Sequence, residues 1–299
     1  MISGSKPLTL AGVLRPSVAA AARAALRSAA KRPLGAAGMF MLVVVALVAL
    51  LAPVLAGHDV NAQDYRQRLQ GPSLTHLMGT DEFGRDLWAR VAYGSRVSLL
   101  VGVAAVALGS LGGLALGLAG GYAGGAVDEL LQRLVEVVLS LPGVLLALAL
   151  MATLGSGVDK VVLALSIVYL PVTLRVVRAS VLSVKENAYI EAARAVGAGS
   201  LRIVLRHVLP NAAPVYLVLA SGLLGSAVLT EATLSFLGLG VPPPLPSWGR
   251  LLSSSVAQYA RTAPWMVVFP GIAITWLVLA FNLVGDALRD AWDPRLRGR

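Results

Sequence analysis

Residues 187–211 read NAYIEAARAVGAGSLRIVLRHVLPN and separate two apolar segments that are each long enough to cross a membrane. Connectors between membrane spans are usually short, whereas this one is polar, basic and long enough for two short helices. A connector with its own helix signals is expected to contact another protein. The alternative is a pair of interfacial helices lying on lipid.

Capping residues divide this segment into two predicted helices. Asn187 is expected to cap a helix over residues 188–196, and Gly197 to end it in the left-handed conformation. Ser200 is expected to cap a second helix, which Pro210 ends because proline has no amide hydrogen to donate. The spacing i, i+3, i+4 and i+7 predicts that this second helix has an apolar stripe formed by Leu201, Val204, Leu205 and Val208.

The same segment resembles the EAA motif of the membrane subunits of bacterial ATP-binding-cassette (ABC) importers. Glu191-Ala192-Ala193, then Gly197, then Leu-Pro has that family's spacing, and the sequence RHVLPN is similar to its peptide and nickel branch. The resemblance implies that the segment is a coupling helix that fits a cleft on a cytoplasmic ATPase. The implied ATPase-coupling residues are Tyr189, Glu191, Ala192, Ala193, Ala195, Gly197, Leu209 and Pro210.

Apolar runs of membrane-span length predict an all-α polytopic protein with six transmembrane helices. The third run is interrupted by Ser140 and Pro142, and the fourth is expected to kink at Pro171. The second is rich in glycine, which lets helices approach closely in lipid. The predicted spans are residues 39–56, 97–119, 134–154, 161–182, 212–237 and 265–285.

Two further blocks, residues 79–99 and 231–240, also resemble the peptide and nickel branch, so the resemblance implies the type I importer permease fold. The expected organisation is a basic cytoplasmic tail (1–38), a first helix with an outer loop (39–96), and a five-helix permease core (97–299). In the outer loop, Asp81, Glu82, Arg85, Asp86 and Arg90 are spaced for local ion pairs, or for an amphipathic helix on the outer leaflet.

Basic residues set the expected orientation. With six spans, both termini and residues 187–211 lie on one side, which then holds 17 of the 25 lysines and arginines. The positive-inside rule makes that side cytoplasmic, in a bacterial plasma membrane. The net charge of +10 therefore reflects topology, and the few interleaved aromatic residues argue against nucleic acid as a partner.

The sequence lacks the patterns of a catalytic site. It has no cysteine, no glycine-lysine phosphate loop, no GxSxG elbow and no HExxH site, and its three histidines lie in separate segments. We therefore predict no catalytic residue, no metal ligand and no cofactor on this chain, with ATP and Mg²⁺ bound by partner subunits. Glu231, near the end of the fifth span, is a candidate pathway or gate residue, although a structural role is favoured.

The resulting hypothesis is a permease subunit of an ABC importer for peptides or related solutes, which forms half of the translocation pathway. The resemblance implies four kinds of association: a second homologous permease, two ATP-binding subunits, an extracytoplasmic substrate-binding protein and the lipid membrane. The rival hypotheses are an ATP-independent secondary transporter or channel, and an intramembrane enzyme. The cargo is not determined by the sequence.

Overall fold

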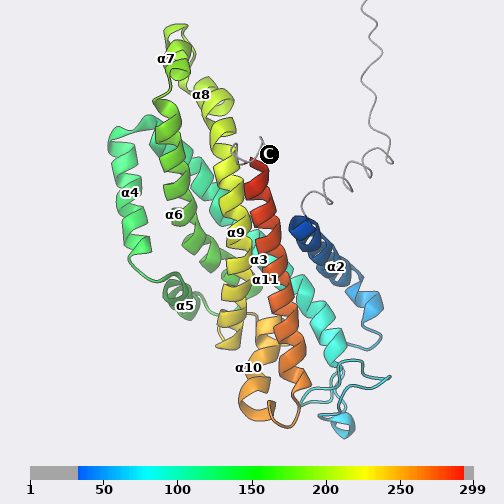
Figure 1. Cartoon of the computed structure of the whole chain (residues 1–299). Helices are drawn as coiled ribbons and strands as arrows, with labels where there is room; N and C mark the ends of the chain where they lie inside the picture. The colour runs from blue at the N-terminus through cyan, green and yellow to red at the C-terminus, as the bar shows by residue number, and fades with distance from the viewer. Residues whose placement is uncertain (1–32, 293–299) are drawn as a thin grey trace, which may run out of the picture.

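The structure, a computed structural model, describes residues 33–292 apart from the side chains of 254–257 and 292. Most of the predicted basic tail (1–38) lies outside these residues. The described part of the chain is helical and contains no strand (Figure 1). Its helices are α2 (Pro33–Leu55), α3 (Leu87–Ala123), α4 (Gly125–Leu139), α5 (Gly143–Leu154), α6 (Val158–Lys185), α7 (Ala188–Ala195), α8 (Ser200–Ile203), α9 (Leu209–Phe236), α10 (Trp248–Tyr259) and α11 (Trp265–Trp292), with short turns η1 (Tyr65–Gln67) and η2 (Val204–Val208).

The prediction of an all-α membrane protein is confirmed. Within residues 33–292, five helices are long and apolar enough to cross a membrane, and the pair α4–α5 makes six if it is counted as one span. Several helices extend beyond their apolar runs, because length is set by capping as well as by lipid. For example, α3 begins ten residues before the predicted span, where the Asp86 side chain accepts a hydrogen bond from the Ala89 amide at 2.7 Å.

The third span is bent rather than straight. Helices α4 and α5 meet at an angle of 87° across the break predicted from Ser140 and Pro142. Proline disfavours the helical conformation of the residue before it, and here Pro142 caps the N-terminus of α5. A bidentate ion pair holds α4 to α6, since the Arg178 guanidinium donates to both carboxylate oxygens of Asp128 at 2.6 Å.

Helices α3 and α6 form the most extensive helix pair. A row of glycines four residues apart on α3 faces the backbone of α6: Gly109, Gly113, Gly117 and Gly121. A Cβ atom added at Gly113 would lie only 2.5 Å from the Leu170 carbonyl oxygen, so a larger residue cannot fit without a shift. The predicted close packing of the glycine-rich span is therefore confirmed. Helix α6 itself runs unbroken through Pro171.

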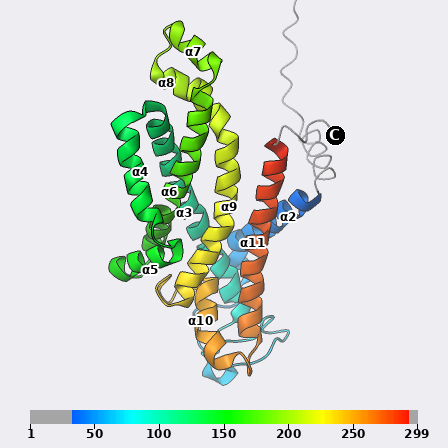
Figure 2. The same cartoon turned by 60° about the vertical axis from the view of Figure 1, so that its left-hand side comes forward.

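The two ends of the bundle differ in construction (Figures 1 and 2). At one end, α7 and α8 project beyond the bundle, on the side where α2 begins and α11 ends. At the other end lie residues 56–86 and α10. We call these the α7 end and the α10 end.

Candidate functional site

Helix α7 is joined to the bundle by a small apolar cluster. Its Ile190 is fully buried against the end of α6 and the start of the following helix, where Val181, Ile203 and Val208 belong to the same cluster. Ile190 is the buried residue of α7. Ala193, one turn further along α7, is half-buried against the same cluster, so the inner face of the helix is packed and its other side chains are exposed.

The C-terminus of α7 has the predicted geometry. Gly197 has φ +82°, and its amide donates to the Arg194 carbonyl at 2.9 Å. The Ala198 amide donates to the Ala193 carbonyl at 3.0 Å, which completes a Schellman motif. Gly197 thus ends α7 by adopting a conformation that other residues reach only with strain.

The two predicted N-terminal side-chain caps are wrong. The backbone of Asn187 is extended, as at a cap, but its side-chain nitrogen donates to the Ser183 and Val184 carbonyls at 3.1 and 3.0 Å. The Asn187 side chain therefore donates to carbonyls at the end of α6 and accepts no amide hydrogen at the start of α7. Ser200 is the first residue of α8 instead of its cap, and the capping position belongs to Gly199.

Pro210 does not end the second helix, which is a correction to the sequence prediction. Residues Ser200–Phe236 form one continuous helix, and the π-helical turn η2 precedes Pro210. The Leu209 amide bonds the Val204 carbonyl five residues back, so the helix absorbs the extra residue and continues past the proline.

The π-helical turn also changes the predicted apolar stripe. Ile203 and Val208, five residues apart, are buried together, whereas Leu201 and Leu205 are 72% and 54% exposed. The predicted stripe is therefore right for Val204 and Val208, which pack in the cluster, and wrong for Leu201 and Leu205. These exposed leucines instead add apolar surface to the α7 end.

The predicted coupling residues gather on this outer surface. Ala193 and Leu209 are half-buried, and the other six are exposed: Tyr189, Glu191, Ala192, Ala195, Gly197 and Pro210. The Tyr189 and His207 rings lie 6.2 Å apart, which links α7 to η2. These eight residues form a surface that combines small, apolar and acidic side chains. We call it the coupling surface.

Glu231 has a different setting. It is fully buried where α9, α3 and the segment before α10 meet. The hydroxyls of Ser235 and Ser98 donate to its carboxylate at 2.7 and 3.2 Å, and Ser247 also hydrogen-bonds it. This arrangement joins three segments at the α10 end and leaves Glu231 enclosed in this conformation.

The charged residues of the outer loop also turn inward, so the alternative of an amphipathic surface helix is wrong for residues 81–86. The Asp81 carboxylate accepts bonds from the amides of Phe83 and Arg85 at 2.8 and 2.9 Å and from the Arg85 guanidinium at 2.6 Å. The Arg90 guanidinium lies 3.6 Å from the same carboxylate. The predicted local pairs of Arg85 with Asp81 and Glu82 are confirmed.

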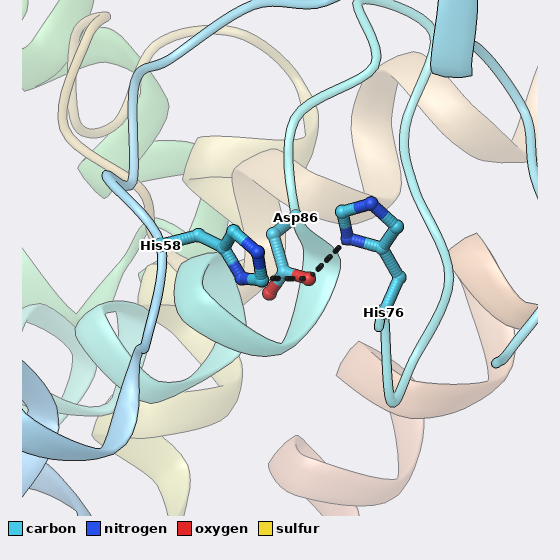
Figure 3. Close-up of side chains that lie close together, drawn as sticks. All are labelled: His58, His76 and Asp86. Atoms are coloured by element: carbon cyan, nitrogen blue, oxygen red, sulfur yellow. Dashed lines mark hydrogen bonds and ion pairs between the residues drawn. The ribbon is translucent and has the colours of Figure 1, made fainter. Parts of the chain in front are cut away.

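Two histidines that are distant in sequence meet at the α10 end. His58 and His76 lie on either side of the Asp86 carboxylate (Figure 3). The third histidine, His207, is in η2. Sequence spacing did not predict this cluster, because the loop that brings the histidines together has no periodic pattern.

Comparison with known families identifies two matching models. Residues 113–298 match the model described as a binding-protein-dependent transport system inner membrane component. Residues 22–72 match the N-terminal transmembrane domain of oligopeptide transport permease C.

Individual relatives are similar over most of the chain. A putative peptide transport system permease protein of Brucella suis is 45% identical over 260 residues, which is 87% of each chain. The dipeptide transport system permease protein DppC of Alkalihalophilus pseudofirmus is 42% identical over 92% of this chain and 90% of its own. The glutathione transport system permease protein GsiD of Escherichia coli O6:K15:H31 is 43% identical over 88% of this chain and 86% of its own.

These matches agree with a helical bundle that has membrane-spanning helices and an exposed connector at one end. The chain therefore belongs to the family of binding-protein-dependent transport system inner membrane components, the multi-pass membrane subunits of bacterial ABC importers.

Proposed function

We propose that this chain is one of two homologous permease subunits of an ATP-driven peptide importer, and that the coupling surface is where a cytoplasmic ATPase docks. The single observation that supports this best is the construction of the α7 end. Helix α7 packs on the bundle through the buried Ile190 and the half-buried Ala193, and six of the eight motif residues are exposed, four of them on α7 itself.

The connections of α7 explain how movement would be transmitted. Ile190 packs in one apolar cluster with the last turns of α6 and the first turns of the α8–α9 helix. A displacement of α7 by a closing ATPase dimer would therefore tilt α6 and α9 together. Rigid tilting of helices around a central pathway is a general mechanism of alternating access.

The orientation and partners follow from the same proposal. Both termini and the coupling surface face the cytoplasm, as the excess of basic residues on that side suggests. The α10 end then faces outward, toward a substrate-binding protein. ATP and Mg²⁺ are bound and ATP is hydrolysed by two partner subunits, and this chain contributes no catalytic group.

Peptides are the proposed cargo class because the names of the relatives include peptide, dipeptide and glutathione transport. Which peptide is carried would be set largely by the binding protein. Ligands that co-purify with that protein would identify the cargo.

The test is ATP-dependent peptide uptake by the complete importer in proteoliposomes, with the Glu191→Ala variant. Glu191 is exposed, so its loss should leave the bundle folded and weaken ATPase docking. We expect uptake per ATP hydrolysed to fall, or the ATPases to dissociate.

The matched control is Glu186→Ala, which removes an exposed carboxylate five residues earlier, outside the motif. It should transport normally. If Glu191→Ala binds the ATPases and couples as well as Glu186→Ala does, Glu191 has no role in coupling. Uptake that persists without ATP or ATPases would contradict the proposed importer itself.

A further inference from the structure

The cluster at the α10 end contains a hydrogen-bond arrangement that a cation would complete. His76 Nε2 lies 2.5 Å from Oε1 of Gln67, and an amide oxygen can only accept. With the Gln67 amide in this orientation, Nε2 is the protonated nitrogen. In a neutral imidazole, the other nitrogen, Nδ1, then has a free lone pair.

That lone pair points at another acceptor. His76 Nδ1 lies 2.8 Å from Asp86 Oδ2, and both residues are buried. The other oxygen of Asp86 is already occupied, since Oδ1 accepts the Ala89 amide at the start of α3. Two acceptors at this distance repel each other unless a positive charge lies between them. That charge can be a proton on Nδ1 or a metal ion.

His58 favours the metal ion. Its Nδ1 lies 3.8 Å from the same carboxylate oxygen, and the three ligand atoms of His58, His76 and Asp86 all lie within 4.8 Å of one another. Ligands around a tetrahedral zinc ion are about 3.4 Å apart, given bonds of about 2.0–2.2 Å. The observed separations of 2.8 and 3.8 Å from Asp86 Oδ2 bracket this value.

We propose that His58, His76 and Asp86 form a binding site for a divalent transition metal ion of the zinc class. Two imidazoles and one carboxylate suit such borderline ions, whereas Mg²⁺ and Ca²⁺ prefer oxygen ligands. Gln67 orients His76 by hydrogen-bonding its second ring nitrogen, as the partners of metal-bound histidines commonly do. The geometry comes from a loop–helix junction, with Asp86 at the N-terminus of α3 (Figure 3).

The site has room for a fourth ligand. The three residues line part of a hollow of about 510 Å³, together with polar side chains that include Gln63, Gln70 and Thr75. A three-ligand zinc site typically completes its shell with water or an exchangeable ligand. Binding would also tie the segment after α2 to the start of α3, because His58 and Asp86 come from these two places.

The test is zinc binding to the purified full-length chain in detergent, by equilibrium dialysis with metal analysis at neutral pH. The chain has no cysteine and only three histidines, so a tag without histidine keeps background binding low. We expect one zinc ion per chain and a higher thermal unfolding midpoint with zinc, because a ligand that binds only the folded state stabilises it.

The decisive variant is His58→Ala, because this side chain is half exposed and its removal leaves the His76–Asp86 contact in place. We expect its zinc affinity to fall by at least about 10-fold and the zinc-dependent rise in midpoint to disappear. Gln67→Ala should weaken binding by about 10-fold while the stoichiometry stays at one. His207→Ala, the matched control, should bind like the unaltered chain.

Two results would overturn the proposal. One is the absence of stoichiometric zinc binding by the unaltered chain, and the other is an affinity of His58→Ala equal to that of His207→Ala. The positive charge on the His76–Asp86 pair would then be a proton. Transport activity is not needed for this experiment, so its outcome does not depend on the proposed function.

Discussion

The two ends of this bundle use charged residues in opposite ways. At the α10 end, the Asp81 carboxylate is nearly fully buried and is held by two backbone amides and by Arg85. At the α7 end, Glu191 is exposed, and the Arg133–Glu129 pair of α4 has side chains 72% and 64% exposed. Asp81 is thus enclosed, whereas Glu191 and the Glu129–Arg133 pair are exposed, although the neighbouring Asp128–Arg178 pair is largely buried.

The difference indicates a division of work. Buried charges are stable only when partners surround them, so the α10 end is arranged before any partner arrives. The outer face of α7, opposite Ile190 and Ala193, is exposed and would gain its contacts from the proposed ATPase. We infer that stability is concentrated at the α10 end and docking at the α7 end.

The largest expected effect is that of Asp81→Ala. Removing this carboxylate leaves the Arg85 guanidinium and two amides without their acceptor and also removes the ion pair with Arg90, and breaking a buried pair costs about 3–5 kcal/mol. The exposed counterpart, Glu129→Ala, should cost less than about 1 kcal/mol. Chemical unfolding of both variants in detergent, followed by circular dichroism, measures the difference in free energy. If both variants lost the same free energy of unfolding, buried charges at the α10 end would be no more important for stability than exposed ones.

Two left-handed glycines offer the next comparison. Gly84 has φ +72°, and an added Cβ would lie 1.8 Å from the Asp64 carbonyl oxygen. We expect Gly84→Ala to cost about 3 kcal/mol or more, from both backbone strain and overpacking. Gly197 has φ +82° but open space around it, so Gly197→Ala should cost about 1–2 kcal/mol.

Gly199 is the matched control for the second of these variants. It lies two residues from Gly197, also has open space, and has φ −66°. Because Gly199 is also the N-cap of α8, Gly199→Ala should lower the unfolding midpoint slightly, by less than Gly197→Ala does, and leave coupling unchanged. If Gly199→Ala lowered the unfolding midpoint as much as Gly197→Ala, the added methyl group, and not the left-handed backbone of Gly197, would be the cause of the loss.

A smaller effect is expected at Glu231. Glu231→Ala leaves the hydroxyls of Ser98 and Ser235 without their buried acceptor, which costs about 1–3 kcal/mol. Glu231→Gln retains one acceptor oxygen and should cost less. Thermal unfolding tests this order. Normal stability of Glu231→Ala with altered peptide uptake would instead assign this residue to the pathway.

Sequence patterns predicted the helical architecture well, because membrane spans depend on apolar length and on breakers such as Pro142. The sequence patterns failed where an irregular helical turn replaced the helix end expected at a proline. The helix end expected at Pro210 is absent because the π-helical turn η2 carries the helix past the proline, and the same turn buries Ile203 together with the predicted Val208. Pro142 correctly predicted where the helix breaks after α4. The 87° angle of the bend accompanies the packing of both α4 and α5 against α6, which sequence patterns do not show.

The candidate sites were predictable to different degrees. The coupling surface is a local feature, so its residues could be listed from one segment. Glu231 and the pair His58–His76 depend on contacts between segments that are distant in the chain, including Ser98 and Asp86. Nothing in the spacing of three isolated histidines indicates that two of them share one carboxylate.

The most direct test of the account is the side of the membrane that each end faces. The chain has no cysteine, so Ala192→Cys on α7 and Leu74→Cys, at a loop position where leucine is 99% exposed, provide unique labels. In right-side-out vesicles, a membrane-impermeant maleimide should label Leu74→Cys at once and Ala192→Cys only after the membrane is opened. Labelling of Ala192→Cys from outside would contradict the assignment of the α7 end to the ATPase.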